Sequence, residues 1–410
     1  MDDVTEPRPV AWRPVVACVT IVQAAQALIV RTVPLFAIPL TSRAAMPPEA
    51  IGQLVSASAL GSMIYFLWGP ELFRRLDERQ QLQAGLALCA VALMACLVPV
   101  WGVMLLASFA VGFGYGPAGP SGSTVILGVA PPQHLSTILS IKQAGVPAGG
   151  LLAGLVLPVI AVAAGLAPAL AVAAGLAVAA AAMLWVWRFP VDRPARPRAG
   201  DRLGARLRET LVAPLRSLPL LLRTPLLRRT MVAGVALGIT QSVLLAYLPL
   251  YLEQHVGWTM AAAGALFGLV QGLGIAGRIA MGWAADRAGS ADRTMAWLCL
   301  ASGATMLAIA ALQPGQSAWA VLPVMGAAGM TVISWNGVFL TGLALGAPRA
   351  QVAAVTGVGT FVLFTGMVLG PLAMQGLVGL TGGYATGMVL AGAIPLAVGL
   401  ALLTEPSAQV

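Results

Sequence analysis

Charged residues are scarce in this 410-residue chain, where they make up 9% of the sequence and include a single lysine, Lys142. Soluble domains carry about 25% charged residues, so the composition excludes an ordinary soluble fold. Reactive groups are scarce too. The two histidines fall in loops, and the four cysteines lie in apolar runs without metal-ligand spacing or a disulfide framework. We therefore expect no metal, no cofactor and no enzymatic activity.

Apolar residues are abundant: 59% of the chain is hydrophobic and its mean hydropathy is +0.89. A transmembrane helix needs about 20 apolar residues. The pattern predicts an all-α membrane protein with twelve transmembrane helices, at residues 14–40, 50–72, 80–100, 102–129, 137–163, 165–188, 230–252, 261–285, 294–313, 317–346, 351–378 and 382–403.

The net charge of +9 comes from arginine, and its distribution argues against nucleic acid as a partner. Half of the 22 arginines lie between Arg188 and Arg229, and most others lie at span ends on the same side. Cytoplasmic loops of membrane proteins are enriched in basic residues in this way. We expect an integral protein of the plasma (inner) membrane with both termini in the cytoplasm.

The basic stretch divides the chain into two halves of six spans. We predict an N-terminal six-helix bundle at 1–188, a cytoplasmic basic linker at 189–229 and a C-terminal six-helix bundle at 230–410. Within the linker, 203–222 has apolar residues at helical spacing among arginines. This segment fits either an amphipathic helix on the membrane surface or a solvated basic tether.

A charged motif follows the eighth span, where Gly282 is followed after three residues by Asp286-Arg287 and then by Gly289. This order resembles the loop motif of the major facilitator superfamily of transporters. In the first half only Arg74 fits it, because Phe73 and Leu76 stand where Asp and Gly belong. The resemblance implies two six-helix bundles around a central cavity and secondary transport by alternating access. We expect a monomer in the lipid bilayer that carries a small-molecule substrate, with Asp286 as a conformational latch.

Glycine and proline recur in the fifth and eleventh spans, as Gly145 with Pro147 and as Gly370 with Pro371. Small residues let membrane helices approach closely, and proline loosens the local hydrogen-bond ladder. The fifth-span segment resembles the Gly-Pro motif of superfamily exchangers, with one residue inserted. These positions are either packing residues or hinges.

Three cations fall inside spans, namely Arg31, Lys142 and Arg278, whereas Glu71, Glu253 and Asp286 fall at span ends. A charge in the bilayer costs about 2.5–3.5 kcal/mol on insertion scales, so each cation needs a partner. Water or an anionic substrate would serve, and long side chains also snorkel to the interface. We hypothesise that Arg278 and Lys142, at similar depth in the two halves, bind the substrate's negative charge together.

Arg278, four residues before Gly282, resembles the substrate-binding arginine of monocarboxylate porters and oxalate–formate exchangers, and Arg31 lies in the span where monocarboxylate porters place a binding lysine. Gly274 stands where those porters have a proton-carrying Asp, so their coupling scheme does not transfer. In this fold the first, fourth, seventh and tenth spans line the cavity. Candidate lining residues there and in the fifth and eighth spans are Gln23, Gln26, Tyr115, Gln143, Gln241, Tyr247, Gln271, Trp335 and Asn336.

These features favour secondary transport of a small organic anion, a carboxylate in the first instance. A proton-coupled drug exporter of the same superfamily is the alternative, although exporters of cationic drugs generally need a buried carboxylate. A membrane receptor or sensor without transport is a third possibility, for which the chain shows no signalling domain.

Overall fold

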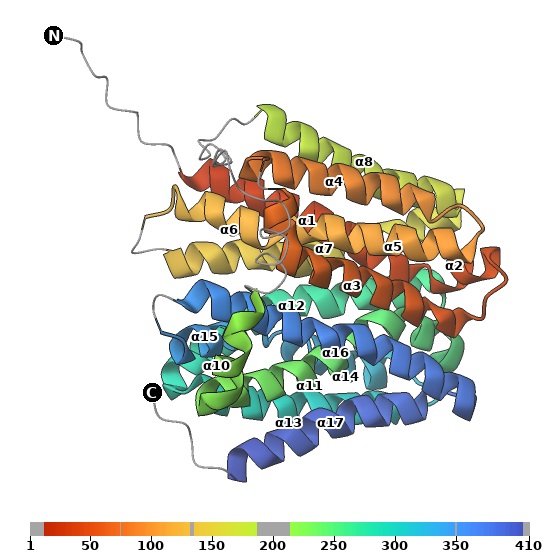
Figure 1. The fold of residues 1–410 in the computed structure, drawn as a ribbon. Coiled ribbons are helices and arrows are strands. Elements are labelled where there is room, and N and C mark those ends of the chain that lie inside the picture. Colours follow the sequence, from red (N-terminus) through yellow and green to blue (C-terminus); the bar gives the residue numbers. More distant parts are fainter. Residues whose placement is uncertain (1–11, 74, 132–134, 187–213, 349–350, 405–410) are drawn as a thin grey trace.

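The computed structural model describes residues 12–73, 75–131, 135–186, 214–348 and 351–404, and every regular element in these ranges is a helix (Figure 1). Eleven helical segments among them are long and apolar enough to cross a membrane. The predicted span that is not among these eleven is the third, which corresponds to α4 (Glu78–Ala95). The first turns of α4 carry Glu78, Arg79 and three glutamines, which lower its mean hydropathy. The chain is thus an all-helical membrane protein.

The helices of the two halves form the upper and lower layers of Figure 1. Besides α4, the described elements of the first half are α1 (Trp12–Leu35), α2 (Ala37–Arg43), η1 (Pro48–Ala50), α3 (Ile51–Leu72), α5 (Trp101–Tyr115), η2 (Gly116–Ala118), α6 (Pro120–Leu127), α7 (Leu135–Ala164) and α8 (Leu166–Val186). Those of the second half are η4 (Pro214–Ser217), α10 (Leu218–Arg223), α11 (Pro225–Tyr251), η5 (Leu252–Val256), α12 (Met260–Ala288), α13 (Ala291–Ala310), α14 (Ala318–Thr331), α15 (Asn336–Gly346), α16 (Val352–Thr381) and α17 (Ala385–Thr404).

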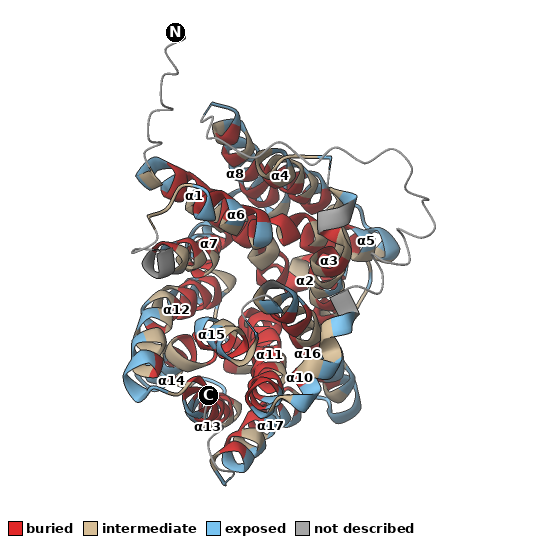
Figure 2. Cartoon of the chain, turned by 60° about the vertical axis from the view of Figure 1, so that its left-hand side comes forward, coloured by how far each residue is buried: buried red, intermediate tan, exposed pale blue. Residues whose placement is uncertain are grey.

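Local sequence signals explain where several helices begin and end. Asp77 and Gln80 form a capping box at the start of α4, and Thr259 caps α12. Gly289, with φ +59°, ends α12 in the left-handed conformation, which glycine adopts without steric cost. The outward faces carry exposed apolar side chains such as Leu106 and Leu380, as a lipid-facing surface requires. In Figure 2 the buried residues line the helix faces that turn toward neighbouring helices.

The fourth and tenth spans are broken, although the sequence predicted continuous helices at 102–129 and 317–346. The fourth is divided into α5 and α6 by η2, and the tenth into α14 and α15 by a turn at 332–335. Pro117 and Pro120 explain the first break, since proline supplies no backbone N–H and disrupts a helix interior. Broken helices leave backbone carbonyls free, and transporters build binding sites around them.

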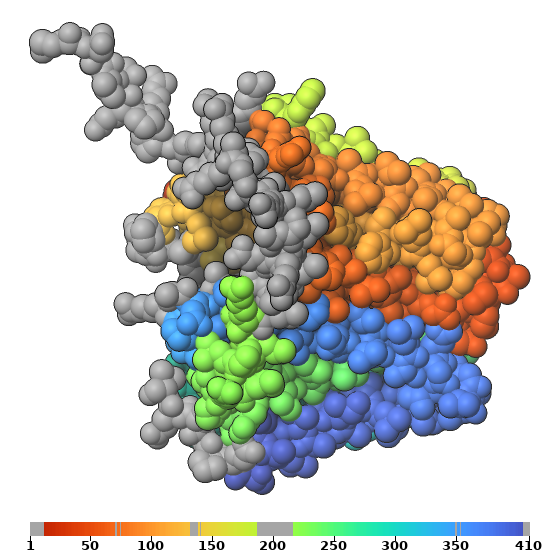
Figure 3. All heavy atoms as spheres, viewed as in Figure 1, coloured from red at the N-terminus to blue at the C-terminus, as the bar shows by residue number. Residues whose placement is uncertain are grey.

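The two halves contact each other mainly through α7 with α12 and α3 with α16. We call the end where α1 begins and α17 ends the terminal end, and the opposite end, with α2 and η1, the far end (Figure 1). Near the far end the helices approach closely. Ser56 of α3 donates a hydrogen bond to the carbonyl of Val368 in α16 (2.6 Å), and a Cβ added at Gly154 of α7 would lie 2.4 Å from the carbonyl oxygen of Gly264 in α12. Figure 3 shows the red-orange and blue atoms of the two halves meeting without a gap toward this end.

The seventh span begins earlier than the predicted residue 230, because α11 starts at Pro225. The last part of the predicted linker is therefore helical, in α10 and the first turn of α11, whereas residues 187–213 lie outside the described residues. Of the predicted amphipathic segment, only Pro214 to Leu222 is described, as η4 and most of α10, and both elements pack against α16. The structure of this part is thus a short helical connection packed against the second half.

Candidate functional site

Arg278 of α12 lies where the two halves meet. Its Nε donates to the carbonyl of Ile333 (3.3 Å), a carbonyl that the break in the tenth span leaves free, and its Nη2 donates to Asn336 Oδ1 (3.2 Å). Its Nη1 crosses to the other half and donates to the carbonyl of Gln143 in α7 (3.1 Å). The guanidinium is therefore held by neutral oxygens from α7 and from the α14–α15 break, instead of reaching along the helix to the membrane surface.

Arg31 and Tyr115 complete this cluster from the first half. The positive charges of Arg31 and Arg278 repel each other, and both lie close enough to Tyr115 for a negative charge on its oxygen to favour them. The Nε atom of Arg31 is buried and has no hydrogen-bond partner. Among the described residues, no carboxylate lies within 4.0 Å of Arg31 or Arg278. The ion pair that the described residues do form joins Arg229 to Asp292. Two arginines, one on each half, thus share a region within the spans where the described residues provide no carboxylate within 4.0 Å.

The hydrogen bonds of Lys142 lie within the first half, and its joint binding of a substrate with Arg278 stays a prediction. Its side chain is 0% exposed, and its Nζ donates to the carbonyl of Gly119 (2.7 Å) and to the hydroxyl of Ser123 (2.9 Å). Gly119 follows the η2 break, and its carbonyl also accepts hydrogen bonds from the backbone N–H (3.2 Å) and the hydroxyl (2.8 Å) of Ser123. The ammonium thus binds beside a helix break within the first half, at a carbonyl that has other partners. Helical spacing placed Lys142 at the right depth; its direction depends on the break beside it, which the sequence reading missed.

Glutamines with unpartnered amide atoms surround the cluster. Gln23 of α1 donates to Gln143 Oε1 (2.9 Å), and Gln26 donates to the carbonyl of Gly114 (2.8 Å), next to Tyr115. Gln271 packs against Gly150 of α7, two turns from the contact between Arg278 and Gln143. Among these glutamines, the buried amide atoms without a partner are Oε1 of Gln23 and Gln26 and Nε2 of Gln271; among the other described residues, Oε1 of Gln241 and Gln316 also lacks one. Buried polar groups normally have partners, so these atoms mark positions where water or a substrate would bind.

Two other predicted lining residues lie elsewhere. Tyr247 is 0% exposed, and its hydroxyl lies 2.8 Å from the carbonyl oxygen of Glu49 in η1 and 3.1 Å from that of Pro371 in α16. It therefore joins the two halves near the far end. Trp335 is also 0% exposed; its Nε1 donates to the carbonyl of Val332, and its ring packs edge-on against Phe339. Trp335 supports the turn that presents Ile333 and Asn336 to Arg278.

The glycines of α7 serve two packing faces. A Cβ at Gly145 or Gly149 would come within 2.8 or 2.2 Å of backbone carbonyl oxygens in α1, whereas Gly150 and Gly154 face α12. Helix α7 stays unbroken through Pro147, as α16 does through Pro371. At Gly370 a Cβ would lie 3.0 Å from the carbonyl oxygen of Ile239 in α11. The contacts account for the glycines by packing, and the hinge roles of the two prolines stay predictions.

The loop motif is at the terminal end and mostly helical. Gly282, Asp286 and Arg287 lie within α12, which Gly289 ends, and a Cβ at Gly282 would meet nothing within 4 Å. Asp286 and Arg287 are exposed, and the Arg287 guanidinium lies 5.4 Å from the centre of the Trp283 ring. Within the described ranges, neither a hydrogen bond nor an ion pair to the carboxylate of Asp286 is found, although its backbone carbonyl accepts from the N–H of Gly289 (3.3 Å). The role of Asp286 as a conformational latch stays a prediction.

A buried acid that the sequence reading missed lies at the start of α13. Asp292 is 2% exposed and Arg229 of α11 is 4% exposed, with Arg229 Nε 3.1 Å from Asp292 Oδ2. Arg229 Nη2 also donates to the carbonyl of Leu402 in α17 (2.6 Å), and Ser290 donates to Asp292 Oδ1 (2.6 Å). This network ties three helices of the second half together. Asp292 lies six residues after Asp286 and just before the predicted span at 294–313. Arg229 lies in the predicted linker, because the sequence predicts the seventh span from residue 230 and α11 starts at Pro225.

Metal chemistry finds no support in the described part of the chain, where no group of three His, Cys, Asp or Glu side chains is placed to hold an ion. The four cysteines are free and buried. Cations, amides and a phenol are the chemistry that the interface between the halves offers.

Comparison with known proteins places this arrangement in a family. The family model described as Major Facilitator Superfamily matches residues 19–371. An uncharacterized MFS-type transporter of Mycobacterium tuberculosis (strain ATCC 25618 / H37Rv) is 28% identical over 359 residues, which cover 86% of this chain and 76% of that protein. A second, from strain CDC 1551 / Oshkosh, is 27% identical over 369 residues with the same coverage.

Solved structures show the same fold at low identity. One is a bacterial homolog of the human lysosomal transporter Spinster, in an inward-facing and unoccupied conformation. Its TM-score is 0.72 at 15% identity, and the match covers 97% of this chain and 96% of that chain. The peptide transporter POT in complex with sulfate has a TM-score of 0.75 at 14% identity, with 95% and 93% covered. The chain therefore belongs to the Major Facilitator Superfamily, and it is a secondary transporter that works by alternating access and not an enzyme.

Proposed function

We propose that this transporter carries a small organic anion, with a carboxylate as its charged group, and that Arg31 and Arg278 bind that group from the two halves. The observation that carries the proposal is the pair of arginines near Tyr115, whose like charges repel each other while no described carboxylate lies within 4.0 Å of either. A cation in the membrane interior is costly without a partner, and an anion between the two would supply one. Arginine suits this role because its planar fork binds a carboxylate through two parallel hydrogen bonds.

Alternating access gives the pair a function in the transport cycle. Arg278 already donates to Gln143 across the interface, so its guanidinium can exchange a neutral carbonyl for a charged substrate oxygen without leaving its place. Hydrogen bonds to charged groups contribute about 1.5–3 kcal/mol, against about 0.5–1.5 kcal/mol for neutral pairs. Substrate would therefore replace weaker contacts by stronger ones at the point where the halves move relative to each other.

The exporter alternative gains little from the structure. It calls for a buried carboxylate facing a cationic substrate. The buried Asp292 instead pairs with Arg229 inside the second half. Glu253 is partly exposed and lies in η5, near the far end. The POT structure in complex with sulfate is one of an anion in a protein of the same fold, but at 14% identity it supports the fold alone.

The proposal is tested by a thermal-unfolding screen in which each small carboxylate is paired with its uncharged amide, such as oxalate with oxamide and lactate with lactamide. A ligand that binds only the native state stabilises it by about 2.7 kcal/mol at 100 times its Kd. We expect at least one carboxylate to raise the unfolding temperature while its amide does not. Flux of that carboxylate into proteoliposomes then establishes transport. Stabilisation by hydrophobic cations alone would favour the exporter.

A further inference from the structure

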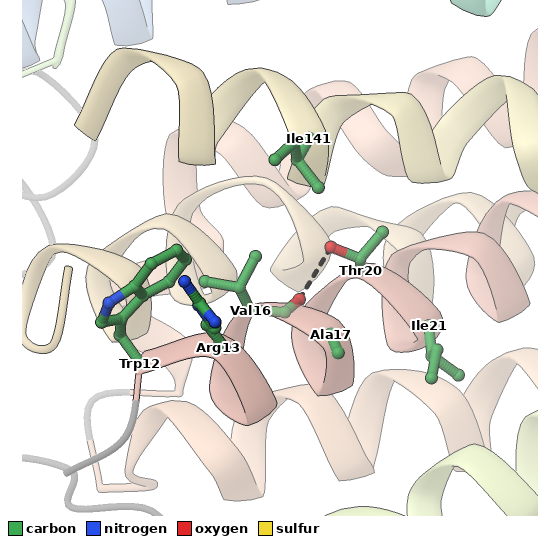
Figure 4. A pocket seen from close by; sticks show the side chains of 7 residues that line it. All are labelled: Trp12, Arg13, Val16, Ala17, Thr20, Ile21 and Ile141. Atoms are coloured by element: carbon green, nitrogen blue, oxygen red, sulfur yellow. Dashed lines mark hydrogen bonds between the residues drawn. The ribbon is translucent and has the colours of Figure 1, made fainter. Parts of the chain in front are cut away.

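An apolar groove runs along the outside of α1, away from the arginine pair. Its first part has a volume of 380 Å³ and lies between α1 and the start of α7 (Figure 4). It is lined by Trp12, Arg13, Val16, Ala17, Thr20, Ile21 and Ile141. A second part of 330 Å³ continues from Ile21 between α1, α7 and α8. Ile21 lines both parts, so they adjoin along α1, and the second extends as far as Leu28.

The floor of this groove offers no free hydrogen-bonding group. The one hydroxyl in its wall, that of Thr20, donates to the carbonyl of Val16 in its own helix (2.7 Å), as the dashed line in Figure 4 shows. Alanines 24, 25, 179 and 180 keep the second part open. Ile21 and Ile141 are each 48% exposed, so the groove opens outward toward the lipid-facing surface. Such a surface fits a hydrocarbon chain.

The polar end of the groove carries a positive charge. Arg13 lies at the terminal end with its guanidinium 5.5 Å from the centre of the Trp12 ring (Figure 4). Tryptophan at the first turn of a span is typical of the membrane–water interface. No acidic residue occurs in α1. Charge and aromatic ring together fit the phosphate region of an anionic lipid.

The length of the first part matches one leaflet. Trp12 and Ile21 are nine residues apart on α1, or about 14 Å at 1.5 Å per residue. The hydrocarbon core of a bilayer is about 30 Å thick, so one leaflet contributes about 15 Å. An acyl chain whose head group lies at Arg13 would therefore reach Ile21 near the midplane of the bilayer. The second part of the groove would hold the end of that acyl chain.

We propose that this groove binds one anionic phospholipid, with its phosphate at Arg13 and Trp12 and one acyl chain along α1 toward Ile21. The site is independent of the arginine pair and of what the transporter carries. Bound there, the lipid fills the space between α1 and α7, the helix that also contacts α12 of the other half. One basic residue near an anionic membrane surface contributes about 1 kcal/mol, which corresponds to about a fivefold preference for anionic over zwitterionic lipid.

The test is native mass spectrometry of the delipidated protein with phosphatidylglycerol or phosphatidylcholine of identical acyl chains. We expect phosphatidylglycerol to be retained about fivefold more, and Arg13→Gln to remove the excess. Arg287→Gln is the matched control, because Arg287 also stacks on a tryptophan at the terminal end but does not line the groove. Ala17→Leu, which fills the groove, should reduce retention of both lipids.

Each variant's unfolding temperature is measured first, so that lost binding is not confused with lost structure. Equal retention of the two lipids by the wild type would overturn the proposal. An equal loss of the anionic excess in Arg287→Gln and Arg13→Gln would also overturn it, since the preference would then reflect surface charge in general.

Discussion

Lys142 and Arg278 are two cations in similar positions with different surroundings. Both lie within spans, and both donate to a carbonyl beside a helix break, Gly119 for Lys142 and Ile333 for Arg278. The bonds of Lys142 all stay within the first half, and its side chain is fully buried. Arg278 bonds across to α7 and interacts with Arg31. A charge in a span is therefore a candidate substrate site only where it faces the interface between the halves.

A third cation, Arg229, differs from both because it has an acidic partner, and it gives the largest expected effect. Asp292→Asn leaves the Arg229 charge buried, so we expect the free energy of unfolding to fall by about 3–5 kcal/mol. Thermal unfolding in detergent measures this. Asp286→Asn, at an exposed acid nearby, is the matched control and should change stability by no more than about 0.5 kcal/mol. Similar effects of the two would mean that the buried pair contributes little.

The comparison is sharpened next by Arg278→Lys, which keeps the charge but removes the planar fork. We expect the affinity for the carboxylate found in the screen to fall by about 1–3 kcal/mol, because one charge-assisted hydrogen bond is lost. Isothermal titration calorimetry measures it, with the matching amide as the uncharged reference. Unchanged carboxylate affinity in this variant would mean that the planar fork of Arg278 does not bind the carboxylate.

Lys142→Met tests the other side of the comparison. Methionine has a similar length but donates no hydrogen bond, so the charge-assisted bonds to the Gly119 carbonyl and the Ser123 hydroxyl are lost, and the free energy of unfolding should fall by about 1–3 kcal/mol. Carboxylate affinity should stay within about twofold of wild type. If affinity falls as far as in Arg278→Lys, Lys142 binds substrate after all and the original pairing hypothesis is restored.

Two tyrosines give the smallest effects and a matched pair. Tyr115→Phe removes a hydroxyl beside both arginines and should weaken carboxylate binding by about 0.5–1.5 kcal/mol. Tyr247→Phe removes a hydroxyl near the far end, where it contacts Glu49 and Pro371. It should leave equilibrium affinity unchanged and lower stability instead. The same calorimetric titration distinguishes the two variants. A larger loss of carboxylate affinity in Tyr247→Phe than in Tyr115→Phe would place the substrate near the far end.

The sequence predicts much of the fold because hydropathy, arginine placement and one loop motif all depend on local composition. It also predicts that Gln271 and Arg278 share a face, since they are seven residues apart, and both do face α7. It does not predict what each face meets. The depth of Lys142 and the span of Tyr247 make them candidate binding residues, whereas in the structure Lys142 donates to Gly119 and Ser123 and Tyr247 contacts the carbonyls of Glu49 and Pro371.

The breaks in the fourth and tenth spans were missed for a different reason. Their residues are apolar enough to read as continuous spans, and only Pro117 and Pro120 signal the first break. The turn at 332–335 contains no proline. It is accompanied by tertiary contacts, including the hydrogen bond from Arg278 to Ile333, that a single sequence does not display.

The most direct measurement of the central claim is a double-mutant cycle on carboxylate affinity, with Arg31→Gln, Arg278→Gln and the double variant, each measured by calorimetry and each checked for folding by thermal unfolding. If the two arginines bind one carboxylate together, the double variant should lose less affinity than the sum of the single losses, with an interaction energy of about 0.5–3 kcal/mol. Losses that add within about 0.5 kcal/mol, or no loss in either single variant, would contradict a shared anion site between the halves.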